Sequence, residues 1–340
     1  MKQSTFYEIT RKYPKLRIAV VGDFCLDRYL EIDPVKQETS LETGLPVHNV
    51  VNVRSQPGGA GTILNNLLAL GVGQVIPIGF AGEDGEGFEL RRALGAHAAV
   101  RMDWFLTTPH RQTFTYCKPL RVTPGKPPVE LNRLDIKNWT PTPAVVQANL
   151  IAAVKQVAQQ VDAIILLDQV DLPETGVITS KLLKAIRSLA KSKPNLPILA
   201  DSRQRLRHFP NVAFKVNRAE FAAMHRSKKD LSLPDLKEQA GEIARNQRRR
   251  VFVTLADQGI IGAEPGGEVE HVSALPLRGE IDIVGAGDCV TANLAAAWAA
   301  GAMLRDALEI ANAASSVVIH QLGTTGTASV PQIWKRVRGR

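Results

Sequence analysis

The residues best placed for chemistry lie at 282–288, in the sequence Asp-Ile-Val-Gly-Ala-Gly-Asp. An alanine-rich stretch that predicts a helix follows directly. A glycine turn at the start of a helix directs backbone N–H groups and the positive end of the helix dipole toward one point. We therefore expect Gly285, Ala286 and Gly287 to hold an anion. The carboxylate of Asp288 would then stand beside a phosphate, where it can accept a proton from an attacking hydroxyl.

Two further motifs combine glycine or polar residues with a predicted helix start. Pro57-Gly58-Gly59-Ala60-Gly61 offers bare backbone against which a ligand can lie, although tight glycine turns are frequent. Asn217-Arg218-Ala219-Glu220 follows a predicted strand. Glu220 could order the water shell of Mg²⁺, which keeps several waters and takes few carboxylates. The same residues equally fit an asparagine helix cap with an acid in the first turn.

The rest of the chain alternates strands and helices. A short apolar strand at 17–23 ends in Gly-Asp, and the pattern becomes regular after Pro143. Further strands are expected at 75–80, 163–168, 197–201, 212–216, 251–255 and 259–263. Helices are expected from the 57–59 turn to Leu70, from Pro143 to about Gln159, and over 174–191, 218–225, 234–247, 287–300 and 304–320. This alternation predicts a mostly parallel sheet with helices on both faces.

Two segments depart from this rhythm. Residues 24–53 and 100–138 contain short alternating stretches punctuated by proline and glycine. We expect parts of both to form a small β flap rather than core. The whole chain, 1–340, then constitutes one α/β domain with this flap as a lid.

Composition narrows the class of protein. The 340 residues are 44% hydrophobic, which suffices for a large packed core. Cys25, Cys117 and Cys289 lie far apart, which argues against a structural zinc site and for a reducing compartment. The N-terminus lacks a signal-peptide pattern and no run of 18 apolar residues occurs, so we expect a cytoplasmic protein without membrane contact.

The net charge of +9 suits an anionic substrate or nucleic acid. The basic clusters are scattered over separate segments with few aromatic residues between them. We interpret them as solvated surface and expect no nucleic-acid partner.

Taken in order, the motifs resemble those of the ribokinase (PfkB) family of carbohydrate kinases over about residues 17–326. The resemblance rests on Gly-Asp-Phe-Cys-Leu-Asp at 22–27, the two motifs just described, Val-Thr-Leu-Ala-Asp-Gln-Gly at 253–259, and the 282–288 turn. Stretches at 22–29, 42–47 and 311–327 look most like the bacterial heptose-phosphate kinases within that family. The resemblance implies a three-layer α/β/α sandwich with a β-sheet lid, and transfer of phosphate from ATP with Mg²⁺ to a hydroxyl of a sugar or sugar phosphate.

The resemblance also implies roles for individual residues. Asp288 would be the general base beside an anion hole of Gly285, Ala286 and Gly287. Substrate-binding positions would be Asp27, Gly58, Gly59, Thr62 and Asn66. Nucleotide-binding positions would be Asn217, Glu220, Thr254, Gly259 and Asn312, with Glu220 meeting Mg²⁺ through water. Carbonyls of Asp282 and Val284 would bind a monovalent cation such as K⁺, and lid strands would pair in a homodimer.

Three positions depart from the family pattern. Thr62 stands where an asparagine is usual, with Asn65 and Asn66 one turn later, which weakens any transfer of sugar specificity. Ala256 replaces a usual glycine, and Ile283 replaces a frequent threonine.

Several alternatives stay open. A nucleoside kinase of the same fold would need an aromatic slot, for which Trp104, Phe105, Phe114 and Tyr116 are candidates. A binding or regulatory protein that has lost catalysis is the second alternative. Four basic residues could meet a phosphate already on the substrate: Lys118, Arg121, Arg133 and Arg203. Convergence of two or more of them beside Asp27 would favour a phosphorylated acceptor.

Overall fold

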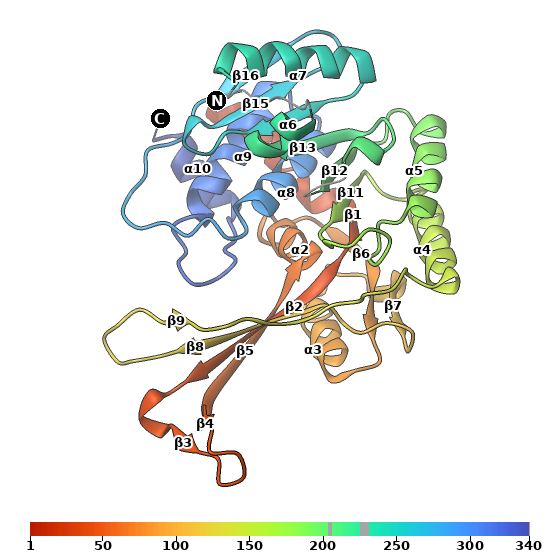
Figure 1. Ribbon diagram of the computed structural model, residues 1–340. Helices are drawn as coiled ribbons and strands as arrows, with labels where there is room; N and C mark the ends of the chain where they lie inside the picture. The colour runs from red at the N-terminus through yellow and green to blue at the C-terminus, as the bar shows by residue number, and fades with distance from the viewer. Residues whose placement is uncertain (203–205, 225–230, 340) are drawn as a thin grey trace.

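A nine-stranded sheet forms the centre of the computed structural model, which describes residues 1–202, 206–224 and 231–339 (Figure 1). Its strands, in spatial order, are β16 (Val269–Val272), β15 (Ile260–Ala263), β14 (Val251–Thr254), β13 (Ala213–Asn217), β12 (Ile198–Ser202), β11 (Ala163–Asp168), β1 (Arg17–Gly22), β6 (Gln74–Gly82) and β7 (Phe105–Thr108). Neighbours from β7 to β14 pair in parallel, whereas β15 and β16 are antiparallel. Their parallel carboxyl ends therefore meet at one edge, where loops can build a site.

Helices cover both faces of this sheet. One core contains buried side chains of α1 (Gln3–Thr10), α2 (Ala60–Ala69), α3 (Gly85–Leu94), α8 (Ala286–Ala299), α9 (Leu304–Val318) and α10 (Val330–Val337). The other contains those of α4 (Ala144–Val157), α5 (Ser180–Ser192), α6 (Arg218–Met224) and α7 (Leu233–Gln247). Side chains of β1 alternate between the two cores, because successive residues of a strand point to opposite faces. The α/β/α sandwich expected from the sequence is confirmed.

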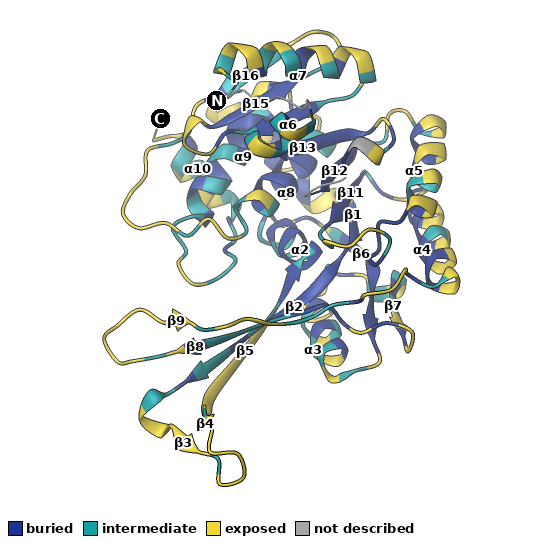
Figure 2. Cartoon of the chain, viewed as in Figure 1, coloured by how far each residue is buried: buried dark blue, intermediate teal, exposed yellow. Residues whose placement is uncertain are grey.

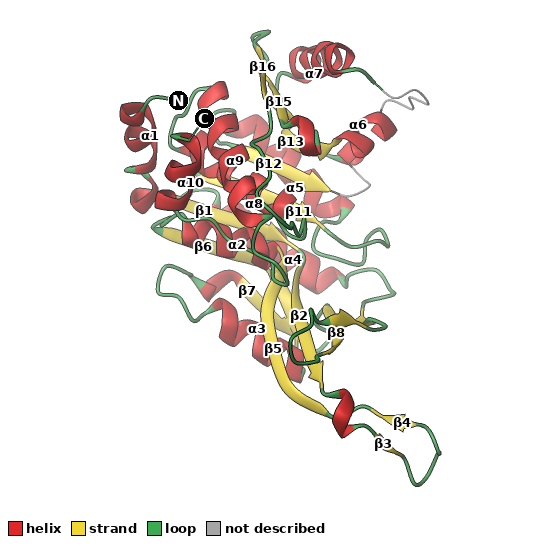
Figure 3. Ribbon diagram, turned by 90° about the vertical axis from the view of Figure 1, so that its left-hand side faces the viewer, coloured by secondary structure: helices red, strands yellow, loops and turns green. Residues whose placement is uncertain are grey.

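A second, smaller sheet extends from the body. It consists of β10 (Leu134–Ile136), β8 (Thr115–Arg121), β2 (Phe24–Ile32) and β5 (Val50–Gly59), with β9 (Val129–Glu130) beside β8. Figures 1 and 3 show β2 and β5 leaving the body together and reaching toward β3 (Glu38–Thr39) and β4 (Pro46–Val47). The outer part of β5 is exposed and that of β2 is half-buried to buried, whereas both strands are mostly buried near the body (Figure 2). We call this the small sheet.

The sequence explains where several elements lie. Strands β1 and β11 are continuous apolar runs because helices cover both of their faces. The helix expected over 174–191 begins only at Ser180, since the Thr179 side chain caps it by accepting a hydrogen bond from the Leu182 N–H. The start predicted at 174 is wrong: residue Glu174 has a φ of 65°, which a helix interior does not allow.

The predicted flap segments divide between the two sheets. Part of 100–138 belongs to the body, because β7 pairs with β6 and Phe105 is buried against Phe24 at a ring-centroid distance of 5.2 Å. Short or weakly periodic sequences hid four elements from sequence reasoning: α1, α3, β16 and α10. None of the helices within the described ranges has the length and apolar character needed to cross a membrane.

Candidate active site

A cavity of about 350 Å³ lies where the small sheet meets the carboxyl end of the main sheet. The 282–288 turn lines it with Val284, Gly285 and Asp288, and the small sheet lines it with Asp27 and Gly59. The buried Cys25 thiol also lies near carboxylates from both of these segments. Burial raises its pKa well above the usual value, and the nearby carboxylates of Asp27, Asp288 and Asp23 raise it further. Residues far apart in sequence thus share one pocket.

The glycine turn has the backbone that anion binding requires. Gly285 is the N-cap of α8 with a φ of 80°, a left-handed conformation that favours glycine. Within the described chain, the N–H groups of Gly285 and Gly287 have no hydrogen-bond acceptor. The Ala286 N–H is different, because it donates to the Ile283 carbonyl at 3.1 Å. A tight turn inside the loop thus occupies the Ala286 amide in this structure, and the anion hole itself stays a prediction.

Asp27 reaches the cavity wall because of its place on its strand and because the neighbouring strand has a glycine, Gly58, beside it. It lies on β2 and is 6% exposed. A Cβ atom on Gly58 would come within 2.5 Å of its Oδ2 atom, so only glycine leaves room for the carboxylate. Burial raises the pKa of Asp27, and the charges of Lys118 and Arg133 oppose that shift.

Three basic side chains line the cavity together with Asp27: Lys118, Arg133 and Lys137. Arg133 forms an ion pair with Asp135 at 2.7 Å, and Lys137 forms one with Asp171 at 2.9 Å. Lys118, like Lys137, is half-buried. Its ammonium lies 5.0 Å from the centroid of the Tyr29 ring, and in the described part of the chain no carboxylate is within ion-pair distance of it.

The other two basic candidates do not join this group. Arg121 is exposed at the end of β8 and does not line the cavity. Arg203 lies outside the described residues.

Asp23 forms hydrogen bonds at the place where the two sheets meet. Its carboxylate accepts hydrogen bonds from the Gln169 N–H at 2.9 Å and the Val177 N–H at 2.7 Å. Burial and then the charge of Asp168 raise the pKa of Asp23 to about 6, although the amide donors oppose the shift. Asp23 also lines the cavity, where these two hydrogen bonds fix its position.

Thr62 and Asn66 differ in whether their side chains reach the cavity. Thr62 lines the cavity, and its Oγ1 atom is buried without a hydrogen-bond partner, so it can meet a ligand. Asn66 is fully buried and does not line the cavity. Its amide donates to the carbonyls of Thr62 at 3.0 Å and Gly326 at 3.4 Å. Its Oδ1 atom is buried without a hydrogen-bond partner, one helical turn away from Thr62, and a substrate role for Asn66 stays a prediction.

The residues expected to bind the nucleotide lie at the edge of the main sheet, outside the cavity. Asn217 and Thr254 are paired neighbours at the ends of β13 and β14. Asn217 and Glu220 cap α6 reciprocally: the Asn217 N–H donates to Glu220 at 2.8 Å, and the Glu220 N–H donates to Asn217 at 2.9 Å. The helix-cap interpretation is thus confirmed, and it leaves both side chains at the surface of the same edge.

Gly259 and Asn312 lie farther along the same edge. Gly259 has a φ of 92°, and a Cβ atom there would lie 2.6 Å from the Ala274 backbone nitrogen. The Asn312 amide donates to the Ser273 carbonyl at 2.7 Å. Both residues therefore shape the loop that follows β16.

The turn and the loop after α9 are tied together. The Asp282 carboxylate accepts hydrogen bonds from the Val284 N–H at 3.0 Å and the Gly323 N–H at 3.2 Å. From the small sheet, the Gln56 amide donates to Thr325 at 2.7 Å and accepts from Thr324 at 3.3 Å. The small sheet thus contacts the loop beside the predicted anion hole, which sequence spacing could not reveal.

The aromatic residues do not form a slot for a base. Phe114 and Tyr116 line the cavity, but Phe105 packs in one core and Trp104 packs against the other. The Arg133 guanidinium lies 5.0 Å from the centroid of the Tyr116 ring, where it covers one ring face.

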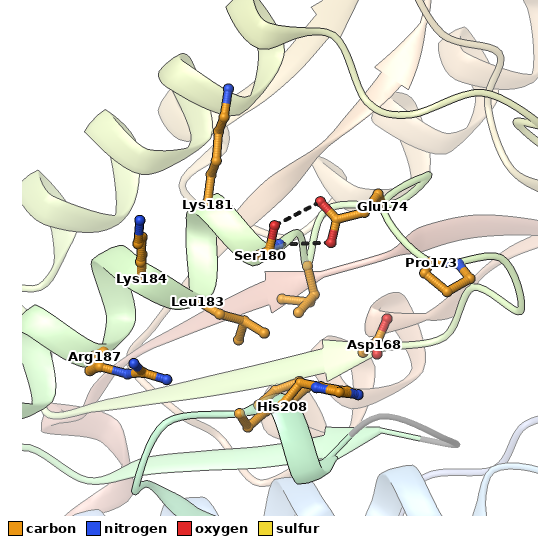
Figure 4. Close-up of a pocket in the computed structure, with 11 residues that line it drawn as sticks. Asp168, Pro173, Glu174, Ser180, Lys181, Leu183, Lys184, Arg187 and His208 are labelled. Carbon is orange, nitrogen blue, oxygen red and sulfur yellow. Dashed lines mark hydrogen bonds between the residues drawn. The ribbon is translucent and has the colours of Figure 1, made fainter.

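A wider cavity of about 560 Å³ lies beside α5, and none of the predicted site residues lines it. Figure 4 shows residues that line it, including Lys181, Lys184 and Glu174, whose carboxylate is hydrogen-bonded to Ser180. Size alone therefore does not locate the site.

Comparison with known proteins identifies the family. The family model for pfkB family carbohydrate kinases matches residues 15–331. The chain belongs to this family. Bifunctional protein HldE of Hyphomonas neptunium is 32% identical over 320 residues, which cover 92% of this chain and 61% of that protein. HldE of Bradyrhizobium diazoefficiens is 30% identical, with 90% of this chain and 60% of that protein covered. The chain spans about 60% of the length of these relatives.

Solved structures agree on the fold. Phosphofructokinase-2 from Escherichia coli in complex with fructose-6-phosphate superimposes with a TM-score of 0.70 at 19% identity, covering 95% of this chain and 99% of the other. Arabidopsis thaliana ribokinase complexed with ribose and ATP gives 0.67 at 19% identity, with the same coverage. At these identities the likeness establishes a ribokinase-like fold.

Within this pfkB fold, the departure at Ala256 has a local explanation. Ala256 adopts a φ of 51°, a left-handed conformation that glycine adopts without penalty. The side chain is exposed, so strain in the backbone, rather than a clash in the core, is the cost of this substitution.

Sequence reasoning missed three further residues beside the pfkB turn. Lys215 on β13 pairs with Asp201 on β12, and Thr291 on α8 donates to Asp201 at 2.9 Å. All three are buried. A lysine inside the apolar strand Ala-Phe-Lys-Val-Asn was the available signal, because a buried charge needs a partner.

Proposed function

We propose that the chain transfers a phosphoryl group from ATP to a hydroxyl of a phosphorylated sugar. The observation that carries this is the shared cavity, which is lined by Asp27 and Asp288 among its carboxylates and by the basic side chains Lys118, Arg133 and Lys137. A carboxylate accepts hydrogen bonds from sugar hydroxyls, and ammonium or guanidinium groups bind a phosphate. The fructose-6-phosphate complex of phosphofructokinase-2, a protein of the same fold, supports an acceptor of this class.

The residues at the turn would carry the chemistry. Asp27 and Thr62 would orient the acceptor hydroxyl toward Asp288, which would take its proton. The N–H groups of Gly285 and Gly287, at the positive end of α8, would stabilise charge on the transferred phosphoryl group. The transition state of phosphoryl transfer is loose, so the hydroxyl becomes acidic late and an ordinary aspartate suffices as base.

Asn217, Glu220, Thr254, Gly259 and Asn312 would hold the nucleotide along the sheet edge. In the described chain no cluster of three histidine, cysteine or acidic side chains forms a metal site. This fits Mg²⁺ arriving with ATP, since Mg²⁺ keeps most of its waters, and Glu220 would contact that water shell. Bound Mg²⁺ would neutralise phosphate charge. The Asp282 and Val284 carbonyls remain the proposed site for K⁺, on the loop that Asp282 ties to Gly323.

The small sheet would act as a lid that excludes water from the transfer. Ion pairs attach the small sheet to α3 of the body, because Arg28 on β2 binds Glu86 and Glu89, each at 3.0 Å. Closure would therefore come from the outer part of the sheet and from the Gln56 contact. Water competing as acceptor would then be kept out of the cavity.

The base is tested by replacing Asp288 with asparagine and measuring ADP release with a panel of sugars, sugar phosphates and nucleosides. We expect turnover of the accepted substrate to fall by ~10²–10⁴, with ATP affinity little changed. Wild-type release of ADP only with nucleosides would replace the proposal with a nucleoside kinase. Ligand binding without any turnover would point to a non-catalytic protein.

The phosphate subsite is tested by Lys118→Met. We expect KM for the phosphorylated acceptor to rise by about 10- to 100-fold, because a charge-assisted hydrogen bond is lost, while KM for ATP stays within about 2-fold. Arg121→Met is the matched control, since Arg121 is exposed on the same strand and does not line the cavity. An equal effect of the two substitutions would remove Lys118 from the subsite.

We also propose a homodimer formed through the small sheet. The outer edge of β5 is unpaired within the described chain, and Val50, Val51 and Val53 are 42%, 46% and 49% exposed. An exposed edge with apolar side chains is a template for pairing with a second copy. Light scattering should give twice the chain mass, and Val51→Lys with Val53→Lys should give a monomer; a wild-type monomer would refute the proposal.

A further inference from the structure

One side of α5 carries all of the charged residues of that helix, and all of them are basic. The helix reads Ser-Lys-Leu-Leu-Lys-Ala-Ile-Arg-Ser-Leu-Ala-Lys-Ser, with no acidic residue. Because an α-helix has about 3.6 residues per turn, positions three or four apart lie on the same side. The basic residues follow this spacing and form a stripe about 15 Å long. We call it the basic stripe: Lys181, Lys184, Arg187 and Lys191.

The basic stripe is not neutralised by acidic side chains. Like charges three or four positions apart on a helix repel each other and destabilise it. Lys181 also lies in the first turn of α5, where the helix dipole disfavours a cation. Within the described chain, none of the four side chains forms an ion pair. A bound anion would therefore relieve repulsion that the protein itself leaves uncompensated.

The basic stripe lines two adjoining cavities. The first, of about 560 Å³, combines the first three residues of the stripe with the apolar side chains of Leu183 and Phe209 (Figure 4). We call it the α5 cavity. The second, of about 550 Å³, shares Arg187 and Phe209 with it and continues to Lys191 and Arg248. Volumes of about 300–1,000 Å³ are typical of sites for small molecules.

The carboxylates that line the α5 cavity are already engaged. Asp168 is 2% exposed and accepts a hydrogen bond from the Ser202 hydroxyl at 2.8 Å. Glu174 accepts from the Ser180 N–H at 2.9 Å and from the Ser180 hydroxyl at 3.1 Å. The cavity thus presents positive charge and apolar surface, a combination that suits an anion with a carbon skeleton.

The α5 cavity shares a wall with the candidate active site. The loop that follows β11 forms this wall: Gln169 and Val170 line the active-site cavity, whereas Pro173 and Ile178 line the α5 cavity. N–H groups of the same loop donate the hydrogen bonds that fix Asp23. A ligand in the α5 cavity would therefore contact the segment that holds the acceptor side of the active site.

We propose that the α5 cavity binds a small ligand that carries two or more phosphates. The phosphates pair with Lys181, Lys184 and Arg187, because charge-assisted hydrogen bonds from ammonium and guanidinium groups to phosphate are strong. A carbon skeleton on the ligand packs against Leu183 and Phe209. The site is separate from the proposed kinase site, and the proposal does not depend on the proposed function.

Lysine acetylation followed by mass spectrometry locates the ligand. The probes are inorganic pyrophosphate and cytidine diphosphate, which carry the same two phosphates without and with a carbon skeleton. We expect a saturating probe to slow acetylation of Lys181 and Lys184 by about 5-fold or more, because bound phosphate occupies the ammonium groups. Lys155, an exposed lysine of α4 that lines neither cavity, is the internal control and should change by less than about 2-fold. The probe that protects at lower concentration identifies the ligand as inorganic or organic.

A double variant tests the charges themselves. Lys184→Gln with Arg187→Gln changes only exposed side chains, so the fold should persist, and Lys181 stays in place to report binding. We expect the dissociation constant read from Lys181 to rise by about 10- to 100-fold. The matched control is Lys155→Gln with Arg92→Gln, which removes the same two charges from exposed positions on α4 and α3. It should bind within about 2-fold of wild type, since charges far apart in water are screened.

Three results would overturn the proposal: no protection of Lys181 by either probe, equal protection of Lys155, or equal losses in the two double variants. Tighter binding of single-stranded DNA than of either probe, with the same lysines protected, would overturn the assignment to a small ligand. Because the measurement reads α5 and not turnover, a wild-type protein that phosphorylates no sugar phosphate would refute the proposed function and leave this site standing.

Discussion

The acceptor side and the nucleotide side of the candidate site are built differently. On the acceptor side, Asp23 and Asp27 are almost completely buried, and hydrogen bonds and neighbouring charges hold the wall they form. On the nucleotide side, Asn217 is exposed and Glu220 is half-buried, and these two side chains cap each other across one helix turn. The acceptor side is therefore preformed. The nucleotide side is an open edge of the sheet, where helix-capping side chains and backbone groups are accessible.

This difference in burial predicts how much each side contributes to substrate binding and specificity. A preformed, desolvated wall can discriminate between acceptors, because a wrong partner leaves buried polar groups unpaired. An open edge interacts mainly through backbone and exposed groups, which water screens. Substitutions on the acceptor side should therefore change specificity strongly, and those on the nucleotide side should act more weakly.

Among the substitutions that compare the two sides, Asp27→Asn should have the largest effect. We expect kcat/KM for the acceptor to fall by ~10²–10³, because a carboxylate has two oxygen atoms that accept hydrogen bonds from hydroxyls and an amide has only one. ATP affinity should not change. Steady-state kinetics with each substrate varied in turn would measure this. A loss that falls mainly on ATP would reverse the contrast between the two sides.

The second prediction concerns pH and Asp23. Its pKa is about 6 in the folded chain, above the usual value of 3.8, so folding favours the protonated form. This contribution is full below about pH 4 and disappears as pH rises through 6, to a total of ~1–3 kcal/mol. The unfolding free energy of wild type minus that of Asp23→Asn should therefore decrease between pH 4 and 6.5 in urea titrations. A flat difference would contradict the buried environment of the acceptor side.

A smaller effect is expected from Glu220→Gln on the nucleotide side. Glutamine can still cap the Asn217 N–H, so the helix should persist, but the charge that would meet Mg²⁺ is lost. KM for ATP should rise about 10-fold and depend more steeply on Mg²⁺ concentration, with acceptor KM unchanged. Asp257→Asn, on a nearby exposed turn, serves as control. A fall in acceptor affinity would show that the two sides are not separate.

The smallest effect should come from Ala256→Gly. Glycine removes the strain of the left-handed backbone at 51°, which favours the folded state by about 1 kcal/mol, partly offset by greater freedom when unfolded. Thermal melts should show a rise of a few degrees or less, and KM for ATP should stay unchanged because the side chain is exposed. A lowered melting temperature would mean that the loop does not hold this conformation.

Much of the fold could be read from the chain because its signals are local. Apolar runs such as 163–168 predicted strands to within a residue, since a strand buried on both faces has no polar positions. The helix start at 174 failed because the cap that decides it, Thr179, lies inside an otherwise unremarkable stretch. Short, weakly periodic elements such as α1 gave no sufficient pattern.

For the site, the residues that could do chemistry were visible in the amino-acid sequence. The glycine turn ending in Asp288, the Gly58-Gly59 pair and Asp27 stand in short motifs, and such motifs depend on the local backbone conformation that glycine allows. Which of these residues lie close together depends on the three-dimensional fold. It placed Lys118 and Arg133 beside Asp27, sent Asn66 into the core, and brought Lys215 against Gly287. The reason is that strand order and register, which no local spacing encodes, set the distances between segments remote in sequence.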